Sequence, residues 1–263
     1  MRDYDTLILA NRRPAGVDDC RRLLLRRPAG FTPRPGQFIQ IEVNRAGTDP
    51  LLRRPFSIAD LQPETVTVIY RVQGRGTARL AERRRGEAIR FLGPLGKDYP
   101  AADGPCLLVA GGMGAAGLLF LARRLAELGR AGSATLLLGC RDRNGLFFRT
   151  AFQKLGVRTV CATEDGSAGR AGLVTDLLRN ELNRDRKPVV YACGPAAMLA
   201  GVHEATRGTG IRAYVSLETV MACGSGLCRG CAVPTRAGYR MACTDGPVFA
   251  AEEIDWKAYV ENA

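Results

Sequence analysis

The stretch Cys106–Gly117, with the sequence CLLVAGGMGAAG, decides how the middle of the chain folds. Five apolar residues, 106–110, predict a buried strand, and the glycines after them predict a tight turn into a helix. Gly112, Gly114 and Gly117 have the spacing G-x-G-x-x-G, which lets a phosphate approach the backbone at a helix N-terminus. The spacing alone is also compatible with a glycine turn that only packs a helix on a sheet.

Strands and helices alternate on both sides of this stretch, from about residue 104 to residue 217. Strands are expected at 134–138, 157–162, 189–192 and 211–217, and helices at 118–128, at 173–182 and from 196. This alternation predicts a parallel sheet wrapped by helices. Ligands of such sheets bind beyond the carboxyl ends of the strands, where Glu164-Asp165 and Cys193-Gly194 fall.

The first 98 residues differ, because short alternating apolar runs such as 38–43 and 65–70 are separated by Pro and Gly. Many short strands with turn signals predict an antiparallel barrel. A short helix is expected after Gly76, with Thr77 as its N-cap and Gly86 just past its end. In the segment 54–57, RPFS, an arginine could bind a pyrophosphate and a serine a ring edge, but ordinary turn and cap roles are equally compatible.

Four cysteines near the end of the chain have the spacing C-x4-C-x2-C-x11-C, namely Cys223, Cys228, Cys231 and Cys243. This is the plant-type spacing for a [2Fe–2S] cluster. A structural zinc site and unmetallated thiols are the alternatives, although zinc sites favour paired C-x2–4-C arms. The other five cysteines are isolated and mostly lie in apolar strands, where a thiol acts as a small hydrophobe: Cys20, Cys106, Cys140, Cys161 and Cys193.

Composition narrows the class of protein. With 263 residues, 46% of them hydrophobic, the chain is long and apolar enough to bury a core, which excludes a disordered protein. The net charge of +12 suits anionic partners such as nucleic acid, phosphate-bearing cofactors or an acidic protein. The one histidine, His203, is expected on a helix surface, and a single histidine excludes a zinc held by a His pair.

Location can also be predicted from the sequence. The uncharged stretch 104–122 has glycines in its middle, so a membrane helix is not expected there. The apolar run near the N-terminus, 7–10, is too short for a secretion signal. With nine cysteines and no such signal, a cytoplasmic protein with metal or redox chemistry is expected.

The motifs together resemble a known family. Arg54-Pro55-Phe56-Ser57, Ile69-Tyr70-Arg71 and Gly76-Thr77 resemble the flavin-binding signatures of the ferredoxin–NADP reductase superfamily. With the segments 191–195 and 216–218 and the cysteine segment, the chain resembles the electron-transfer subunits of type B (NAD-dependent) dihydroorotate dehydrogenases over nearly its full length.

The resemblance implies an α+β multidomain fold: an FAD-binding β-barrel over 1–100, an NAD-binding α/β domain over 101–218 and a [2Fe–2S] segment over 219–263. It implies FAD contacts from Arg54, Pro55, Phe56, Ser57, Ile69, Tyr70, Arg71, Gly76 and Thr77, NAD contacts from Gly112, Gly114, Glu164, Asp165, Cys193 and Gly194, and cluster ligation by Cys223, Cys228, Cys231 and Cys243. Arg141 and Arg143 would equally suit a 2′-phosphate, so the preference for NAD comes from the resemblance alone.

The implied function is electron transfer between NAD(H), FAD, the cluster and an FMN-containing catalytic dihydroorotate dehydrogenase subunit in pyrimidine biosynthesis, in a heterotetramer. A nicotinamide gives two electrons and the cluster takes one at a time, so a flavin is expected between them, with no acid–base catalytic residue required. Another flavin iron–sulfur NAD(P)H reductase subunit, linked to hydrogenase or ferredoxin, would share these cofactors. The alternative of another class is a zinc-stabilised basic nucleic-acid-binding protein, but no basic helix with interleaved aromatics supports it. Neither nucleic acid nor a membrane is expected as a partner.

Overall fold

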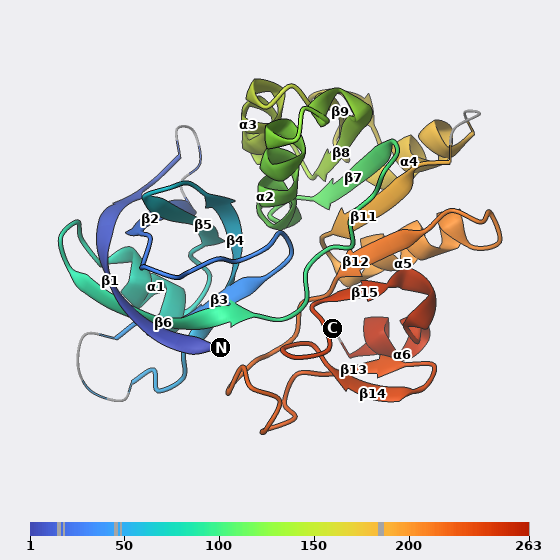
Figure 1. The fold of residues 1–263 in the computed structure, drawn as a ribbon. Helices are drawn as coiled ribbons and strands as arrows, with labels where there is room; N and C mark the ends of the chain where they lie inside the picture. Colours follow the sequence, from blue (N-terminus) through green and yellow to red (C-terminus); the bar gives the residue numbers. More distant parts are fainter. Residues whose placement is uncertain (15–16, 18, 45–46, 48, 184–186, 263) are drawn as a thin grey trace.

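Figure 1 shows the computed structural model, which describes residues 1–14, 17, 19–44, 47, 49–183 and 187–262. An N-terminal barrel, drawn in blue and teal, lies beside a sheet with helices, drawn from green to orange, and the red C-terminal segment packs below that sheet. The expected fold class, an antiparallel barrel, a parallel-sheet domain and a C-terminal segment, is confirmed.

Six antiparallel strands close the barrel in the order β1-β2-β5-β4-β3-β6. They are β1 (Arg2–Arg12), β2 (Cys20–Arg26), β3 (Phe38–Ile41), β4 (Arg54–Leu61), β5 (Thr65–Arg71) and β6 (Ala88–Leu95). Because successive side chains of a strand point to opposite faces, every second residue fills the barrel core. Leu23 and Leu25 of β2 and Ile39 and Ile41 of β3 are fully buried there.

The short barrel helix α1 (Arg75–Ala81) starts earlier than the sequence indicated. Its N-cap is Gly74, so the prediction that Thr77 caps it is wrong. The Thr77 hydroxyl instead lies inside the first turn and accepts hydrogen bonds from the amides of Gln73 and Gly74, at 3.0 and 3.2 Å. The helix also ends before the expected position, and Gly86, with φ +88°, lies in the turn that leads to β6.

The central sheet has seven strands in the order β10-β9-β8-β7-β11-β12-β15. The strands are β7 (Cys106–Gly111), β8 (Ala134–Cys140), β9 (Arg158–Thr163), β10 (Arg170–Ala171), β11 (Val189–Cys193), β12 (Ala213–Ser216) and β15 (Val248–Ala250). All neighbours are parallel except β15, which runs antiparallel to β12. The chain order reverses between β7 and β11, and crevices outside such a reversal are where open α/β sheets bind ligands.

Helices cover both faces of this sheet. They are α2 (Gly114–Glu127), α3 (Arg149–Lys154), α4 (Val174–Leu182) and α5 (Ala196–Thr206), with short 3-10 turns at Ala131–Ser133 and Arg143–Phe148. Leu108 of β7 packs in the core shared with α2 and α3, whereas Val109 packs in the core shared with α4 and α5. A strand buried on both faces is continuously apolar, which explains the run that begins at Cys106.

Helix α2 also joins the sheet to the barrel (Figure 1). Phe120 of α2 is buried in the barrel core. Arg123, one turn further, forms an ion pair with the buried Asp60 of β4. One helix therefore fixes the position of the barrel against the sheet by both apolar and ionic contacts.

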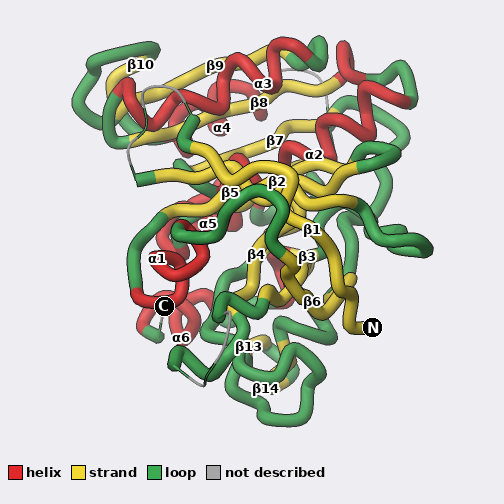
Figure 2. Tube along the Cα trace, turned by 90° about the vertical axis from the view of Figure 1, so that its left-hand side faces the viewer, coloured by secondary structure: helices red, strands yellow, loops and turns green. Residues whose placement is uncertain are grey.

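The C-terminal segment contains a hairpin of β13 (Ala232–Thr235) and β14 (Gly238–Met241), the sheet strand β15, a 3-10 turn at Ala251–Glu253 and helix α6 (Trp256–Glu261). Figure 2 shows the hairpin at the end of the molecule opposite to β9 and β10. The prediction that His203 lies on the surface is wrong: it is 5% exposed, because Trp256 of α6 covers it with ring centroids 5.8 Å apart. No helix within the described residues is long and apolar enough to cross a membrane.

Candidate functional site

A cavity of about 1430 Å³ lies between the barrel and the carboxyl ends of the sheet strands. It brings together thirteen of the fifteen residues that the sequence indicated for cofactor contacts. These are Arg54, Pro55, Phe56, Ser57, Ile69, Tyr70, Arg71, Thr77, Gly112, Gly114, Glu164, Cys193 and Gly194. Gly76 and Asp165 do not line the cavity. Gly76 lies directly against the Arg54 side chain, so it supports a lining residue.

On the barrel side, β4 and β5 present an aromatic and cationic wall. The rings of Phe56 and Tyr70 lie 5.4 Å apart, and the Tyr70 hydroxyl donates to Asn11 Oδ1 at 3.1 Å. Burial raises the pKa of Tyr70 to about 12, so the ring stays a neutral phenol. Next to it, Arg54 donates from Nη1 to the Leu52 and Arg53 carbonyl oxygens, and its other N–H groups have no partner among the described residues. The wall suits a flat ring joined to an anionic group.

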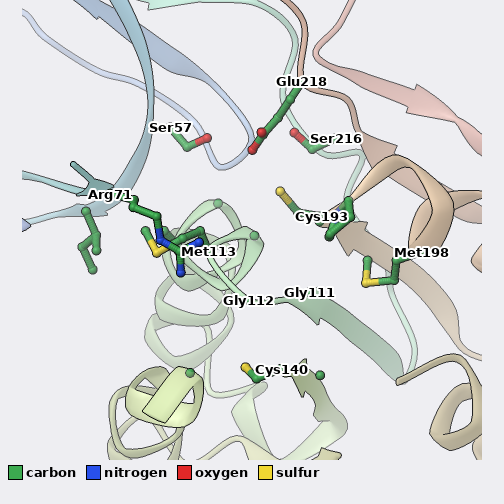
Figure 3. A pocket seen from close by; sticks show the side chains of 18 of the residues that line it. Ser57, Arg71, Gly111, Gly112, Met113, Cys140, Cys193, Met198, Ser216 and Glu218 are labelled. Carbon is green, nitrogen blue, oxygen red and sulfur yellow. The ribbon is translucent and has the colours of Figure 1, made fainter. Parts of the chain in front are cut away.

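Arg71 completes this wall from the end of β5. Its Nε lies 2.8 Å from the carboxylate of Asp19, which also lines the cavity. Figure 3 shows the Arg71 side chain directed toward Met113, in the loop after β7. Met113 in turn lies 3.5 Å, sulfur to sulfur, from Cys20 of the barrel. The two walls therefore touch at this point, which closes one side of the cavity.

On the sheet side, the loops after β7 and β11 approach each other very closely. A side-chain carbon at Gly114 would lie 2.0 Å from the Cys193 carbonyl oxygen, so only glycine fits there. Gly112 has φ +50° and donates its amide to the Gly139 carbonyl at 2.8 Å. The glycine spacing is therefore required for packing, and the helix α2 N-terminus that it exposes faces the cavity.

A polar corner of the cavity contains Ser57, Cys193, Ser216 and Glu218 (Figure 3). A side-chain carbon at Gly117 would lie 3.2 Å from Cys193 Sγ and 3.6 Å from Ser57 Oγ, so this glycine leaves the space that brings the two side chains together. Burial, and then the charge of Glu218, raise the pKa of the Cys193 thiol. Burial also raises the pKa of Glu218. The corner thus offers hydroxyl, thiol and carboxyl groups that can donate or accept hydrogen bonds.

The loops after β8 and β9 form the far rim of the cavity. Glu164 and Arg141 line it. Asp165 has a different role: its Oδ1 accepts the Ser167 amide at 2.9 Å, and the Ser167 hydrogen bonds lower the pKa of that carboxyl. Arg143 is likewise held by the Ser167 carbonyl at 2.7 Å. Asp165 and Arg143 therefore shape the turn, and Glu164 and Arg141 are the residues that face the cavity.

The four cysteines of the expected cluster lie in one loop region between β12 and β15. Cys231 Sγ and Cys243 Sγ are 3.2 Å apart, and the Cys228 amide donates to Cys223 Sγ at 3.4 Å. A two-iron cluster needs two thiolates on each iron, and the adjacent sulfurs of Cys231 and Cys243 suit one such pair. Within the described residues, no group of three or more His, Cys, Asp or Glu side chains is arranged to hold a single metal ion.

Backbone amides surround these sulfurs, as an iron–sulfur site requires. Ser225 and Cys228 donate to Cys223 Sγ at 3.4 Å, Gly226 donates to Cys243 Sγ at 3.2 Å and Gly230 to Cys228 Sγ at 3.4 Å. Hydrogen bonds from Ser225 and the Cys228 amide lower the pKa of Cys223 to about 6. Burial and the Cys231 thiol raise the pKa of Cys243 to about 12, and burial raises the pKa of the isolated Cys106 and Cys140 thiols to about 11. The cysteine segment fits the group that its spacing predicts.

Comparison with known proteins agrees with this geometry. Residues 218–255 match the family model described as the iron–sulfur cluster binding domain of dihydroorotate dehydrogenase B, and residues 108–204 match the oxidoreductase NAD-binding domain. The electron transfer subunit of dihydroorotate dehydrogenase B (NAD(+)) from Shouchella clausii is 42% identical over 232 residues, covering 84% of this chain and 86% of the relative. This chain belongs to that family of electron transfer subunits.

Other members and one solved structure extend the comparison. The corresponding subunit from Geobacillus thermodenitrificans is 41% identical, with coverage of 84% and 86%, and the homolog from Aquifex aeolicus is 39% identical, with coverage of 89% and 91%. A structure described as an NADH-dependent reduced ferredoxin-NADP oxidoreductase, studied for flavin-based electron bifurcation, matches with a TM-score of 0.85. The two chains are 30% identical, and the match covers 98% of this chain and 92% of the other.

Residues 216–219 of the cavity were not assigned a role from the sequence alone. Ser216 ends β12 and Glu218 follows it, at the carboxyl edge where ligands of such sheets bind, and that position is the signal that could have identified them. Met113 carries the same signal, since it lies in the glycine loop after β7, whereas Asp19 carries none, because its place in the cavity depends on how the barrel meets the sheet.

Proposed function

We propose that this chain transfers electrons between NAD(H), FAD and a [2Fe–2S] cluster, to or from an FMN-containing catalytic subunit that interconverts dihydroorotate and orotate in pyrimidine biosynthesis. One observation carries the proposal. Phe38 of β3 lines the cofactor cavity and packs in the same core as Cys231 and Cys243. The cavity and the cysteine segment thus share one buried core, which suits electron transfer between them.

In this proposal the barrel wall holds FAD. Phe56 and Tyr70 flank a flat ring, Ser57 binds a ring edge, and Arg54 binds the pyrophosphate with its free N–H groups, supported by the α1 segment at Gly76 and Thr77. Pro55, Ile69 and Arg71 complete the contacts. A bound flavin supplies the exchange between two-electron and one-electron chemistry that a nicotinamide and an iron–sulfur cluster require.

NAD(H) binds on the sheet side of the same cavity. Gly112 and Gly114 bring the α2 N-terminus to its phosphates, Glu164 faces it from the rim, and Cys193 and Gly194 lie beside the position of the flavin ring. Asp165 orders the rim loop through Ser167. The corner of Ser57, Cys193 and Glu218 offers the hydrogen-bonding groups that orient the two rings.

Cys223, Cys228, Cys231 and Cys243 hold the cluster, and the amides around their sulfurs stabilise its negative charge. We further propose that the chain works as three units, residues 1–100, 101–218 and 219–263, within a heterotetramer with the catalytic subunit. Its location would be the cytoplasm, where thiols stay reduced.

The test uses the full chain purified without oxygen. The expected preparation contains one FAD and two irons per chain, and NADH bleaches the flavin absorption faster than NADPH does. Mixed with a dihydroorotate-oxidising FMN subunit, it should support orotate-dependent NADH oxidation, and Cys228→Ser should abolish that coupling. A colourless preparation that contains zinc, or no coupling with intact cofactors, would contradict the proposal.

A second candidate is an NAD(P)H reductase subunit linked to ferredoxin. The structural match to an NADH-dependent reduced ferredoxin-NADP oxidoreductase, over 98% of this chain, favours it. The two candidates differ in the electron acceptor. Reduction of ferredoxin with no coupling to a dihydroorotate-oxidising subunit would support this second function over the first.

A further inference from the structure

Strand β3 presents different residues to its two sides. All four residues, Phe38–Ile41, are buried. Ile39 and Ile41 point into the barrel core, whereas Phe38 belongs to the buried core that also contains Cys231 and Cys243. Because side chains alternate along a strand, Gln40 points to the same side as Phe38, toward the cysteine segment.

Gln40 is a buried polar residue whose side-chain amide has nothing to bind. It is 1% exposed, and neither Nε2 nor Oε1 has a hydrogen-bond partner among the described residues. A buried amide left without partners destabilises the folded chain. Its surroundings include Leu95, so an apolar residue would suit the same space. The described residues therefore supply no hydrogen-bond partner for the Gln40 side-chain amide.

The Gln40 amide lies against the cysteine loop. A side-chain carbon at Gly224, the residue after Cys223, would be 2.8 Å from Gln40 Oε1 and 2.9 Å from Cδ. Gly224 also has φ +69°, which other residues rarely adopt. This glycine is what allows the loop to come so close to Gln40.

The known donors to the cysteine sulfurs all come from the loop itself, from the amides of 225, 226, 228 and 230. When iron binds, the thiols lose their protons and inorganic sulfides are added, so the number of acceptor sulfurs rises. A donor from outside the loop can serve additional sulfurs without changing the loop. Gln40 offers two N–H groups at this position.

We propose that Gln40 is a positioning residue for the cluster and donates its side-chain amide to a sulfur of the [2Fe–2S] site. The inference rests on the proposed function for the presence of that cluster. Hydrogen bonds to sulfur stabilise the more negative reduced state and raise the reduction potential. Gln40 also pairs in register with Pro55 of β4, which lines the cofactor cavity. Strand β3 therefore supports the barrel wall of the FAD site and, through Gln40, sets the reduction potential of the cluster.

The test is the midpoint potential of the cluster in the full FAD-containing chain, followed by electron paramagnetic resonance. Gln40→Leu removes the donors and keeps the volume, and Gln40→Met is a second variant of similar length. Loss of one hydrogen bond of about 1 kcal/mol predicts a roughly five-fold lower ratio of reduced to oxidised cluster at the wild-type midpoint. For a one-electron couple this is a decrease of about 40 mV, together with altered g values.

Gln62→Leu is the matched control, because Gln62 is a barrel glutamine that donates to Asp60 at 3.3 Å. Its cluster potential should equal that of the wild type. The iron-free Gln40→Leu chain should be at least as stable as iron-free wild type, since a buried unpaired amide is removed. Unchanged potential and spectrum in both Gln40 variants, or a less stable iron-free chain, would overturn the inference. Wild-type protein without iron would instead contradict the proposed function.

Discussion

Replacing Arg54 by alanine should weaken FAD binding and leave the iron–sulfur site intact. The guanidinium is fixed at one end by the Leu52 and Arg53 carbonyl oxygens, so its remaining N–H groups are already oriented toward the cavity. A hydrogen bond to a charged group contributes about 1.5–3 kcal/mol. With one such bond lost, the dissociation constant of FAD should rise about 10- to 150-fold, since 1.4 kcal/mol corresponds to a factor of ten.

The assay titrates FAD into flavin-free protein and follows the quenching of flavin fluorescence. Arg90→Ala is the matched control: Arg90 belongs to the same barrel and pairs with Asp5 at 3.0 Å on the surface, so its loss changes the charge equally and should leave the FAD constant unchanged. Iron content and visible circular dichroism report the cluster. Equal FAD affinities of Arg54→Ala and wild type would refute the placement of the pyrophosphate, and a parallel loss of iron would refute the independence of the two sites.

Three further predictions test the packing, the cluster and the histidine. Gly114→Ala should lower the free energy of unfolding by about 1–3 kcal/mol in denaturant melts, because the added methyl group meets the Cys193 carbonyl. Gly132→Ala is the control and should not lower it, because no atom lies within 4 Å of the added methyl group. Equal free energies of unfolding for the two variants would contradict the close approach at Gly114. Cys228→Ser should lose most of the iron while FAD absorption remains, and full iron occupancy would exclude Cys228 as a ligand. Burial lowers the pKa of His203 below its usual value near 6.5, so the free energy of unfolding should fall as the pH drops through 6.5 toward the folded-state pKa. The imidazole proton resonance measures that pKa directly, because the chain has one histidine. A measured pKa above 6.5 would reverse the sign of this pH dependence.

Local patterns predicted most of the fold, because strand β7 and helix α2 follow directly from apolar runs and glycines that act within a few residues. The cysteine spacing predicted a site for the same reason: its ligands are close in sequence. The start of α1 was misplaced because a threonine side chain can accept amide hydrogen bonds either as an N-cap or from within the first turn.

Long-range contacts explain what the sequence did not predict. His203 is buried only because Trp256, more than fifty residues later, covers it. Asp19 reaches the cavity only where the barrel meets the sheet, and Gln40 reaches the cysteine loop only because β3 lies beside it. In each case the decisive neighbour lies in another region of the chain, and no local pattern identifies it.

The return of the chain from the cysteines to the sheet has a consequence for how the protein tolerates the loss of iron. The segment that holds the cysteines leaves the sheet after Ser216 of β12 and returns to it as β15, which pairs with β12. The Leu217 amide donates to the Pro247 carbonyl at 2.9 Å, so the two ends of this segment are hydrogen-bonded to each other. A loop closed in this way can lose its metal and rearrange without separating the sheet. Damage by oxygen should therefore stay local, and iron and sulfide could rebuild the centre on a scaffold that never unfolded.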